Sequence, residues 1–310
     1  MTRPAGHPPV ILTIAGSDPS GGAGIQADLK TFSALGAYGC AVITALTAQN
    51  TTGVTGVFPI PGSFVGEQLD TLFADVAIDA VKIGMIANAE IVVAVARALR
   101  SHRPRYVVLD PVMVATSGDR LLTRDAERVL REELVPLADL ITPNLDEAAA
   151  LLGTERAVTA AEASEQAYAL RSSGAARVLV KGGHLQTGDS ATDFLLELDG
   201  PISEIGGPRI ATSNTHGTGC TLSSAIAALR PVAADWLEAV RGAKRYLISA
   251  LEGADQLAIG GTGTGTGEYQ GHGPVHHFVG IWPSAPPRPE RRGRQLAAGH
   301  PGPDDGSIEQ

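Results

Sequence analysis

The chain has 310 residues, of which 44% are hydrophobic and only 4% are aromatic. This length allows one large α/β domain or two small ones, and the apolar fraction is enough for a substantial core. The formal net charge of −9 argues against general nucleic-acid binding, which needs a basic face. Phosphate ligands stay open, because backbone amides and a metal ion can supply positive potential locally.

The two cysteines, Cys40 and Cys220, are too few for a disulfide framework or a zinc cluster. A reducing setting is therefore the simplest inference. The N-terminal residues lack the apolar core of a signal peptide, and no apolar run reaches the length of a membrane span. We expect a cytoplasmic protein with neither membrane nor nucleic-acid partners.

Short β-branched runs alternate with longer helical patterns along the chain. In chain order, the predicted strands are residues 10–15, 41–46, 80–83, 106–110, 140–142, 178–181 and 194–198. The predicted helices are residues 23–35, 63–73, 89–99, 124–134, 145–152, 160–171, 218–229 and 234–251. Apolar strands that alternate with amphipathic helices predict a three-layer α/β/α fold with a central, mostly parallel sheet.

One domain is preferred over two, because no linker splits residues 10–255. We assign residues 9–282 to this domain. The glycine- and threonine-rich run within residues 260–272 predicts a flexible inserted loop, since no lysine closes it and no helix follows. Residues 283–310 are rich in proline, arginine and glycine, which is typical of a disordered tail.

Polar residues follow most of the predicted strands at the point where each strand ends. They lie at residues 16–18, 49–50, 84–85, 110, 142–144 and 181–184. Ligands of parallel α/β sheets bind outside the carboxyl ends of the strands. These six segments therefore indicate one site at that rim.

The segment Asn214-Thr-His-Gly-Thr-Gly-Cys220 precedes an apolar helical run. A glycine-rich turn at a helix start leaves amides unpaired, and these amides attract anions together with the helix dipole. Cys220 would lie in the same positive field, which lowers the pKa of a thiol. An anion hole beside a potential base is typical of a phosphotransferase. A plain turn before a core helix with a buried cysteine is an equally good interpretation of this segment alone.

A second glycine-rich segment, residues 16–24, leads into Asp28. Its glycines permit positive φ angles and a close backbone approach, and its spacing differs from the dinucleotide-binding fingerprint. Asp28 would lie in the early turns of a helix, where a carboxylate can accept hydrogen bonds from a ligand. Its alternative role is a charge that stabilises the helix dipole.

Taken together, these motifs resemble the hydroxymethylpyrimidine/phosphomethylpyrimidine kinases. The resemblance covers roughly residues 9–258 plus 273–278 and is carried by segments 16–28, 45–50, 82–85, 109–113, 142–147, 181–184, 214–220 and 273–278. It implies a ribokinase-like fold and an enzyme that uses ATP and Mg²⁺. The implied activity is phosphorylation of 4-amino-5-hydroxymethyl-2-methylpyrimidine and then of its monophosphate, in thiamine biosynthesis. It also suggests a homodimer.

The resemblance assigns a role to each motif. Cys220 matches the proposed base on the hydroxymethyl group, and the amides of Gly217, Thr218 and Gly219 would hold charge on the transferred phosphoryl group. The implied pyrimidine contacts are Gly16, Asp28, Gln49 and Met85. Gln49 suits an aminopyrimidine because an amide offers both a donor and an acceptor, although it could instead cap its own loop.

The nucleotide side is implied by a second set of residues, namely Asn144, Glu147, Lys181 and Thr215, with Asp110 and Glu147 near Mg²⁺. Asn144 and Glu147 also fit a helix capping box, and both roles are compatible. Lys181 could alternatively be a snorkelling surface residue. His216 is either a base or a turn residue that shapes its loop.

Three other functions stay open at this point. A pyridoxal or pyridoxine kinase could use the same fold. A thiol hydrolase or transferase could use Cys220 as a nucleophile. A non-catalytic protein could bind the pyrimidine without phosphate release from ATP.

Overall fold

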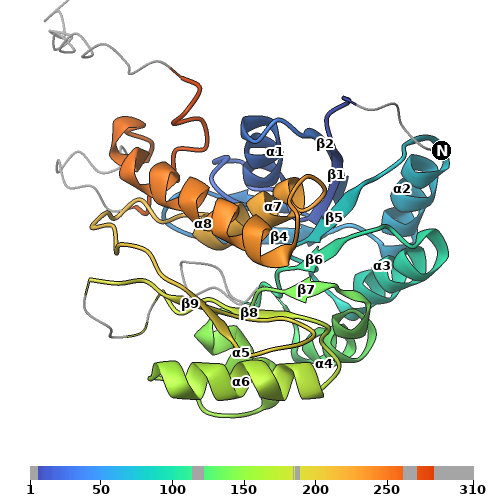
Figure 1. The fold of residues 1–310 in the computed structure, drawn as a ribbon. Helices are drawn as coiled ribbons and strands as arrows, with labels where there is room; N and C mark the ends of the chain where they lie inside the picture. The colour runs from blue at the N-terminus through green and yellow to red at the C-terminus, as the bar shows by residue number, and fades with distance from the viewer. Residues whose placement is uncertain (1–5, 114–121, 184, 186–188, 261–270, 283–310) are drawn as a thin grey trace, which may run out of the picture.

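An eight-stranded sheet forms the centre of the computed structural model, which describes residues 6–113, 122–183, 185, 189–260 and 271–282 (Figure 1). The strand order is β10-β9-β8-β7-β6-β5-β1-β2. Six neighbouring strands of this sheet are parallel to one another, namely β8, β7, β6, β5, β1 and β2. The strand β9 is antiparallel to both of its neighbours, β8 and β10. Their bounds are β1 Val10–Ala15, β2 Tyr38–Ile43, β5 Ala80–Ile83, β6 Val107–Leu109, β7 Leu140–Ile141, β8 Val178–Val180, β9 Asp193–Leu196 and β10 Ser203–Ile205. The prediction of a central, mostly parallel sheet is confirmed.

Helices cover both faces of the sheet (Figure 1). One layer consists of α1 Gly24–Ala34, α7 Thr218–Leu229 and α8 Trp236–Glu252. The other consists of α2 Gly62–Asp75, α3 Ala89–His102, α4 Arg124–Glu133, α5 Leu145–Leu152 and α6 Ala160–Ser172. Two short 3₁₀ turns, η1 Val135–Leu137 and η2 Ala254–Gln256, complete the described elements.

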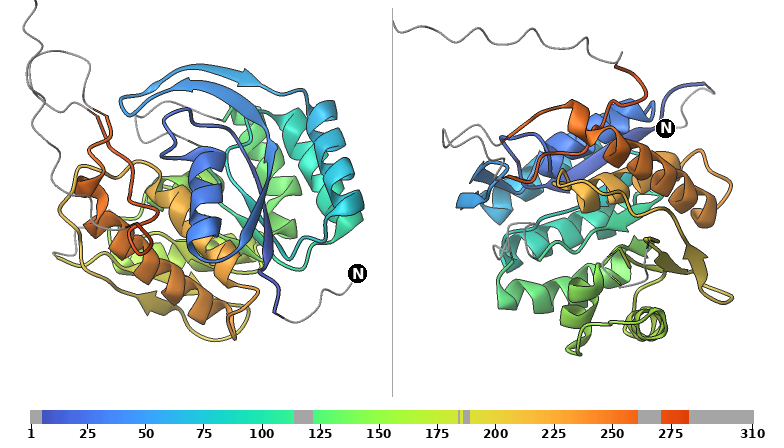
Figure 2. Two further views of the ribbon diagram at one scale, coloured as in Figure 1. Left: turned by 90° about the horizontal axis from the view of Figure 1, so that it is seen from above. Right: turned by 90° about the vertical axis from the view of Figure 1, so that its left-hand side faces the viewer.

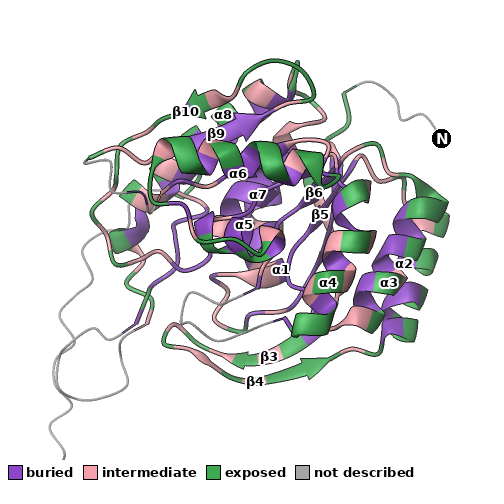
Figure 3. Cartoon of the chain, turned by 90° about the horizontal axis from the view of Figure 1, so that it is seen from below, coloured by how far each residue is buried: buried purple, intermediate pink, exposed green. Residues whose placement is uncertain are grey.

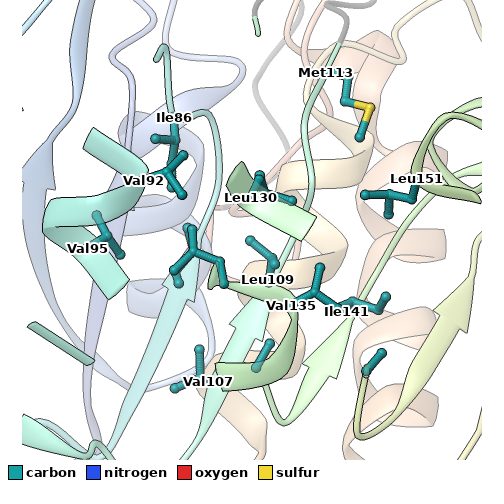
Figure 4. Packing of buried hydrophobic residues seen from close by; sticks show 14 of the residues in the cluster. Ile86, Val92, Val95, Val107, Leu109, Met113, Leu130, Val135, Ile141 and Leu151 are labelled. Atoms are coloured by element: carbon teal, nitrogen blue, oxygen red, sulfur yellow. The ribbon is translucent and has the colours of Figure 1, made fainter. Parts of the chain in front are cut away.

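The two layers arise from the alternation of side chains along each strand. In β1, Ile11 packs with α7 and α8, whereas Leu12 packs on the opposite face. Val108 and Leu109 divide in the same way in β6. Figure 4 shows part of the larger cluster, in which α3, α4 and the central strands meet. Because both faces are covered, the strands read as continuous apolar runs in the sequence.

One predicted strand was wrong in its bounds. The run at residues 41–46 is split, because β2 ends at Ile43 and β3 (Ala45–Gln49) leaves the sheet to pair with β4 (Val54–Pro59) in a hairpin of its own. The sequence offers no glycine or proline at this break. The bend at Thr44 is held by tertiary bonds, since its hydroxyl donates to the Met85 carbonyl at 2.7 Å. Figures 2 and 3 show that the hairpin extends from the sheet and is largely exposed.

The predicted insertion starts and ends beside this hairpin. Gly260 and Gly271 both lie against Thr51, and the His272 amide donates to the Thr51 carbonyl at 2.9 Å. Residues 261–270 of this loop and the whole predicted tail, 283–310, lie outside the described residues. In the part of the chain that is described, no helix has the length and apolar character needed to cross a membrane.

Candidate active site

The helix α7 packs against β1, β5 and β6, and its start lies at the carboxyl ends of the strands, close to the residues that follow β6 and β8. Gly217 precedes the helix in a left-handed conformation with φ of +80°. A side chain at this position would collide with the Gly22 carbonyl, so only glycine fits. The second glycine, Gly219, faces the Lys181 ammonium and the Asp110 carboxylate. The turn therefore brings the helix start, the glycine-rich loop and two charged side chains together.

Of the three amides predicted for the anion hole, those of Gly217, Thr218 and Gly219, the Thr218 amide is already hydrogen-bonded within the turn. The Thr218 N–H donates to the Thr215 carbonyl at 3.2 Å, and the Thr218 hydroxyl donates to the same oxygen at 2.6 Å. By contrast, no described residue accepts a hydrogen bond from the amides of Gly219 and Cys220. These two amides lie at the positive end of the helix dipole and are available to an anion, as is the predicted Gly217 amide, for which the described residues offer no acceptor either.

Lys181 joins the two predicted acidic residues. Its ammonium lies 2.8 Å from Asp110 Oδ1 and 3.6 Å from Glu147 Oε2. Asp110 also accepts from Thr142 Oγ1 at 3.0 Å and from Ser223 Oγ at 3.2 Å. Burial alone would raise the pKa of Asp110, but Lys181 and Lys82 hold it below its ordinary value. Lys181 is therefore part of a buried ionic cluster and does not snorkel.

Glu147 belongs both to this cluster and to a capping box. Its Oε2 accepts from the Asn144 amide at 2.7 Å, and Asn144 Oδ1 accepts from the Glu147 amide at 2.8 Å. Burial raises the pKa of Glu147 to about 7, against the opposing charge of Lys181. The two interpretations of this motif are thus compatible, since the cap itself lies at the cluster.

The donor set at this cluster fits Mg²⁺. Mg²⁺ prefers oxygen ligands and keeps several waters, so one or two carboxylates beside phosphate oxygens are enough. Asp110 and Glu147 supply those carboxylates, and Glu147 Oε1 has no hydrogen-bond partner among the described residues. The described residues contain no cluster of three or more His, Cys, Asp or Glu that could hold a metal without such help.

Cys220 is half-buried in the first turn of α7, and the Gly24 amide is hydrogen-bonded to it. Burial raises the pKa of its thiol to about 11, although the Lys82 ammonium acts in the opposite direction. The expectation that the helix field lowers this pKa is therefore wrong. The loss of solvent around the sulfur outweighs the dipole, so Cys220 is a neutral thiol in the free protein.

Asp28 lies beneath the site. Its side chain and that of Lys82 are both 0% exposed, and Lys82 Nζ is 2.9 Å from each carboxylate oxygen. Thr13 Oγ1 and Ser224 Oγ each donate to the same carboxylate at 2.6 Å. Protein donors thus occupy both oxygens, which places Asp28 out of direct reach of a ligand. Its charge instead holds the Lys82 ammonium close to Cys220.

The glycine-rich loop is organised by Asp18, which is 1% exposed. Asp18 accepts hydrogen bonds from the amides of Ser20, Gly22 and Ala23 at 2.9, 3.1 and 2.8 Å. His216 Nε2 lies 2.7 Å from Asp18 Oδ2. These three amides are therefore bonded to an internal carboxylate and are not free to bind an anion.

The remaining predicted ring contacts flank this loop. Met85 lies against Gly16, since a Cβ on Gly16 would stand 3.0 Å from Met85 Sδ. Gln49 is on β3 of the hairpin, and its amide lies 3.5 Å from His216 Nε2. The structure thus brings Gly16 and Met85 together and places Gln49 beside His216, whereas Lys181, Asp110 and Glu147 form a separate cluster at the start of α7.

Sequence reasoning missed the two buried ion pairs that hold these groups. Lys82 lies inside an apolar strand, and its only sequence signal was that a charge there must be neutralised. Asp18 was noted as one polar residue of the rim, but nothing local linked it to His216, which is 198 residues away.

Comparison with known proteins identifies relatives over most of the chain. Residues 18–275 match a family model described as phosphomethylpyrimidine kinase. The hydroxymethylpyrimidine/phosphomethylpyrimidine kinase of Escherichia coli K12 is 55% identical over 271 residues, which are 87% of this chain and 98% of that protein. The crystal structure of phosphomethylpyrimidine kinase from Clostridium difficile 630 is 40% identical, with a TM-score of 0.69, over 78% of this chain and 99% of that one.

A pyridoxal kinase has a similar fold. The Staphylococcus aureus enzyme, in complex with AMP-PCP, is 32% identical with a TM-score of 0.77, over 88% of this chain and 95% of that one. The predicted ribokinase-like fold is confirmed by these structures. Fold similarity does not separate the two activities, whereas sequence identity favours the pyrimidine kinases.

The buried pair Lys82–Asp28 makes a prediction for stability. Lys82→Met leaves the Asp28 carboxylate buried without its counter-charge, which should cost roughly 3–5 kcal/mol in the free energy of unfolding. Urea denaturation measures this loss. The double variant Lys82→Met/Asp28→Asn removes both charges and should recover much of the loss. A double variant that is as unstable as the sum of the two single variants would show that the residues are not coupled.

The raised pKa of Cys220 predicts slow alkylation at neutral pH. In a Cys40→Ala background, the rate of reaction with iodoacetamide should rise about tenfold per pH unit from about pH 7 to about pH 9.5 without levelling off, because only the thiolate reacts. The protein is checked for folding by circular dichroism at each pH. A rate that becomes constant near pH 8 would mean that the helix field dominates over burial.

Proposed function

Because the chain belongs to the phosphomethylpyrimidine kinase family, we propose that it transfers the γ-phosphoryl group of ATP to 4-amino-5-hydroxymethyl-2-methylpyrimidine. A second transfer then converts the monophosphate to the diphosphate, in thiamine biosynthesis. The observation that carries the proposal is the convergence at the start of α7. Free amides, the Lys181 cluster and the Cys220 sulfur lie together there.

On the nucleotide side, Lys181 would contact the phosphates of ATP, together with the Asn144, Glu147 and Thr215 segments. The amides of Gly219 and Cys220 would bind the transferred phosphoryl group, on which charge is spread in the loose transition state. Gly217 and Thr218 would shape the turn that aims these amides. Asp110 and Glu147 would hold Mg²⁺ with the help of waters and phosphate oxygens; the ion would neutralise the triphosphate.

On the acceptor side, Gly16 and Met85 would contact the pyrimidine ring and Gln49 would bind its polar edge. The hydroxymethyl oxygen attacks the γ-phosphorus, the bond between that phosphorus and the β,γ-bridging oxygen breaks, and ADP leaves. The hydroxyl proton passes to Cys220 Sγ in its thiolate form. The thiolate is a minor species at neutral pH, but a loose transition state needs little nucleophilic push.

Lys82 and Asp28 would act from below the site. The Lys82 ammonium is the largest factor that lowers the pKa of Cys220 against burial. Asp28 holds that ammonium in place through two contacts of 2.9 Å. We therefore assign Asp28 a positioning role in place of a direct contact with the ring.

Pyridoxal phosphorylation is the second candidate function, because the fold matches that of a pyridoxal kinase with a TM-score of 0.77. Both rings are small heteroaromatics that carry a hydroxymethyl group. The 55% identity to the pyrimidine kinase favours the first assignment.

We also propose a homodimer that is formed through the outer face of the hairpin. Leu46 and Phe58 are direct cross-strand partners on this face and are 47% and 66% exposed. An isolated two-stranded hairpin with apolar side chains on an open face is marginally stable in water. A two-fold axis would place each apolar face against its copy in the second chain.

Two further assignments complete the proposal. Residues 9–282 would form the kinase domain, with residues 260–272 as an inserted loop and residues 283–310 as a tail outside it. The two free thiols, Cys40 and Cys220, fit a reducing compartment, so we place the enzyme in the cytoplasm.

The proposed activity is tested by incubation of the protein with the aminopyrimidine alcohol, ATP and Mg²⁺, with pyridoxal as the competing substrate. Chromatography should resolve the mono- and diphosphate products, with higher kcat/KM for the pyrimidine. Cys220→Ala should lower kcat by roughly 10²–10⁴-fold, the range for a general base. Faster turnover of pyridoxal would overturn the substrate assignment, and full activity of the alanine variant would remove the role of Cys220.

The homodimer is tested by size-exclusion chromatography with light scattering. The wild type should have twice the chain mass of 31.9 kDa, and Phe58→Asp should give monomers because it places a charge in the apolar contact. Val232→Asp is the matched control, since Val232 is 69% exposed but lies after α7, away from the hairpin. A Phe58→Asp protein that stays dimeric would exclude this surface.

A further inference from the structure

A buried histidine connects three separate segments of the site. His216 is 7% exposed and lies in the turn before α7. Its Nε2 atom is 2.7 Å from Asp18 in the glycine-rich loop and 3.5 Å from the Gln49 amide on the hairpin. Neither the transfer reaction nor the anion hole, as derived above, uses this side chain.

The state of His216 follows from its partner. Burial alone would raise the pKa of Asp18, but hydrogen bonds from His216, Ser20 and the loop backbone hold it below its ordinary value. Asp18 is therefore a carboxylate, which only accepts hydrogen bonds. His216 Nε2 must carry a proton and donate it to Asp18. It is then unable to accept a hydrogen bond from the amide nitrogen of Gln49.

The contact at the other end of the Gln49 amide leads independently to the same conclusion about its orientation. Thr47 Oγ1 lies 3.3 Å from Gln49 Oε1, and the Thr47 hydroxyl donates its single proton to the nearer Ser17 carbonyl at 2.9 Å. The hydroxyl can therefore only accept a hydrogen bond from Gln49. We assign the amide the orientation opposite to the one in which Oε1 lies at Thr47 and Nε2 at His216, so that its nitrogen points to Thr47 and its oxygen to His216.

We propose that His216 is a positioning residue that fixes the orientation of the Gln49 amide and thereby determines which hydrogen bonds Gln49 offers to the acceptor ring. The proposal rests on the proposed function, in which Gln49 binds the ring. In this orientation, one N–H of the Gln49 amide is bonded to Thr47 and one lone pair of its oxygen faces His216. The amide keeps its second N–H and its second oxygen lone pair for the ligand. A ring nitrogen beside an exocyclic amino group is complementary to that pair, as adenine is to a glutamine amide.

The expected signature is an effect on the acceptor alone. His216→Ala lets the amide rotate, so the KM for the alcohol should rise roughly 2- to 12-fold, the span of one hydrogen bond. The kcat and the KM for ATP should stay close to the wild type, because the Gly219 and Cys220 amides are untouched. In a Gln49→Ala background, His216→Ala should cause no further rise, since there is no amide left to orient.

The experiment is this double-mutant cycle, measured with whichever of the aminopyrimidine alcohol and pyridoxal the wild type phosphorylates faster. The wild-type preference tests the proposed substrate, and the coupling between residues 49 and 216 tests the role of His216, so the two can fail separately. His272→Ala is the matched control, because His272 is exposed and contacts the same turn at Ser213 without reaching Gln49.

Thr47→Val provides a second test if the His216 variant is unstable. It removes the bond at the other end of the amide with little change in shape, and it should raise the KM for the alcohol in the wild type but not in the Gln49→Ala background. Equal effects of His216→Ala in both backgrounds would overturn the proposal. A matching rise in the KM for ATP would do the same, because it would mean that His216 only shapes its own turn.

Discussion

Charge burial at the carboxyl ends of the parallel strands is the constraint on which the site depends. Two lysines, Lys82 on β5 and Lys181 after β8, lie where water is largely excluded, and each needs a carboxylate at hydrogen-bond distance. Asp28 and Asp110 meet that need, and Thr and Ser hydroxyls satisfy their remaining lone pairs. The result is a charge-compensated floor of buried ion pairs under the first turn of α7.

This floor determines the electrostatic surroundings of Cys220, which is half-buried above it. The helix dipole alone does not overcome the loss of solvent around the sulfur, which raises the pKa of the thiol to about 11. Without the Lys82 ammonium, burial would raise it further. The ion pair with Asp28 therefore keeps a positive charge near the sulfur, while Gly219, which has no side chain, faces the Lys181 ammonium and the Asp110 carboxylate.

The sequence predicts well which residues lie at the carboxyl ends of the strands, because the signals for these positions are local. Strand ends, helix starts and glycine turns are each encoded within a few residues, so Lys181, Asp110 and the turn at 214–220 were placed correctly. The hairpin was missed because residues 41–46 look like one continuous strand, and the break at Thr44 depends on a bond to Met85. The raised pKa of Cys220 and the Asp18–His216 pair depend on burial and on contacts across nearly 200 residues, which no local pattern contains.

The candidate site has two parts, the buried ion pairs beneath α7 and the β3–β4 hairpin. This division bears on how related kinases differ. In the proposed reaction, phosphoryl transfer uses the start of α7 and the charged cluster below it, which belong to a fold that a pyridoxal kinase also has. The proposed ring contact, Gln49, lies on the hairpin, where Thr47 and Gln49 alternate with Leu46 along β3 and lie on the opposite face. A contact that covers Leu46 and Phe58 would restrain the same two strands that carry Gln49. Acceptor choice would then depend on the hairpin and its contacts, while the transfer chemistry stays with the buried charges beneath α7.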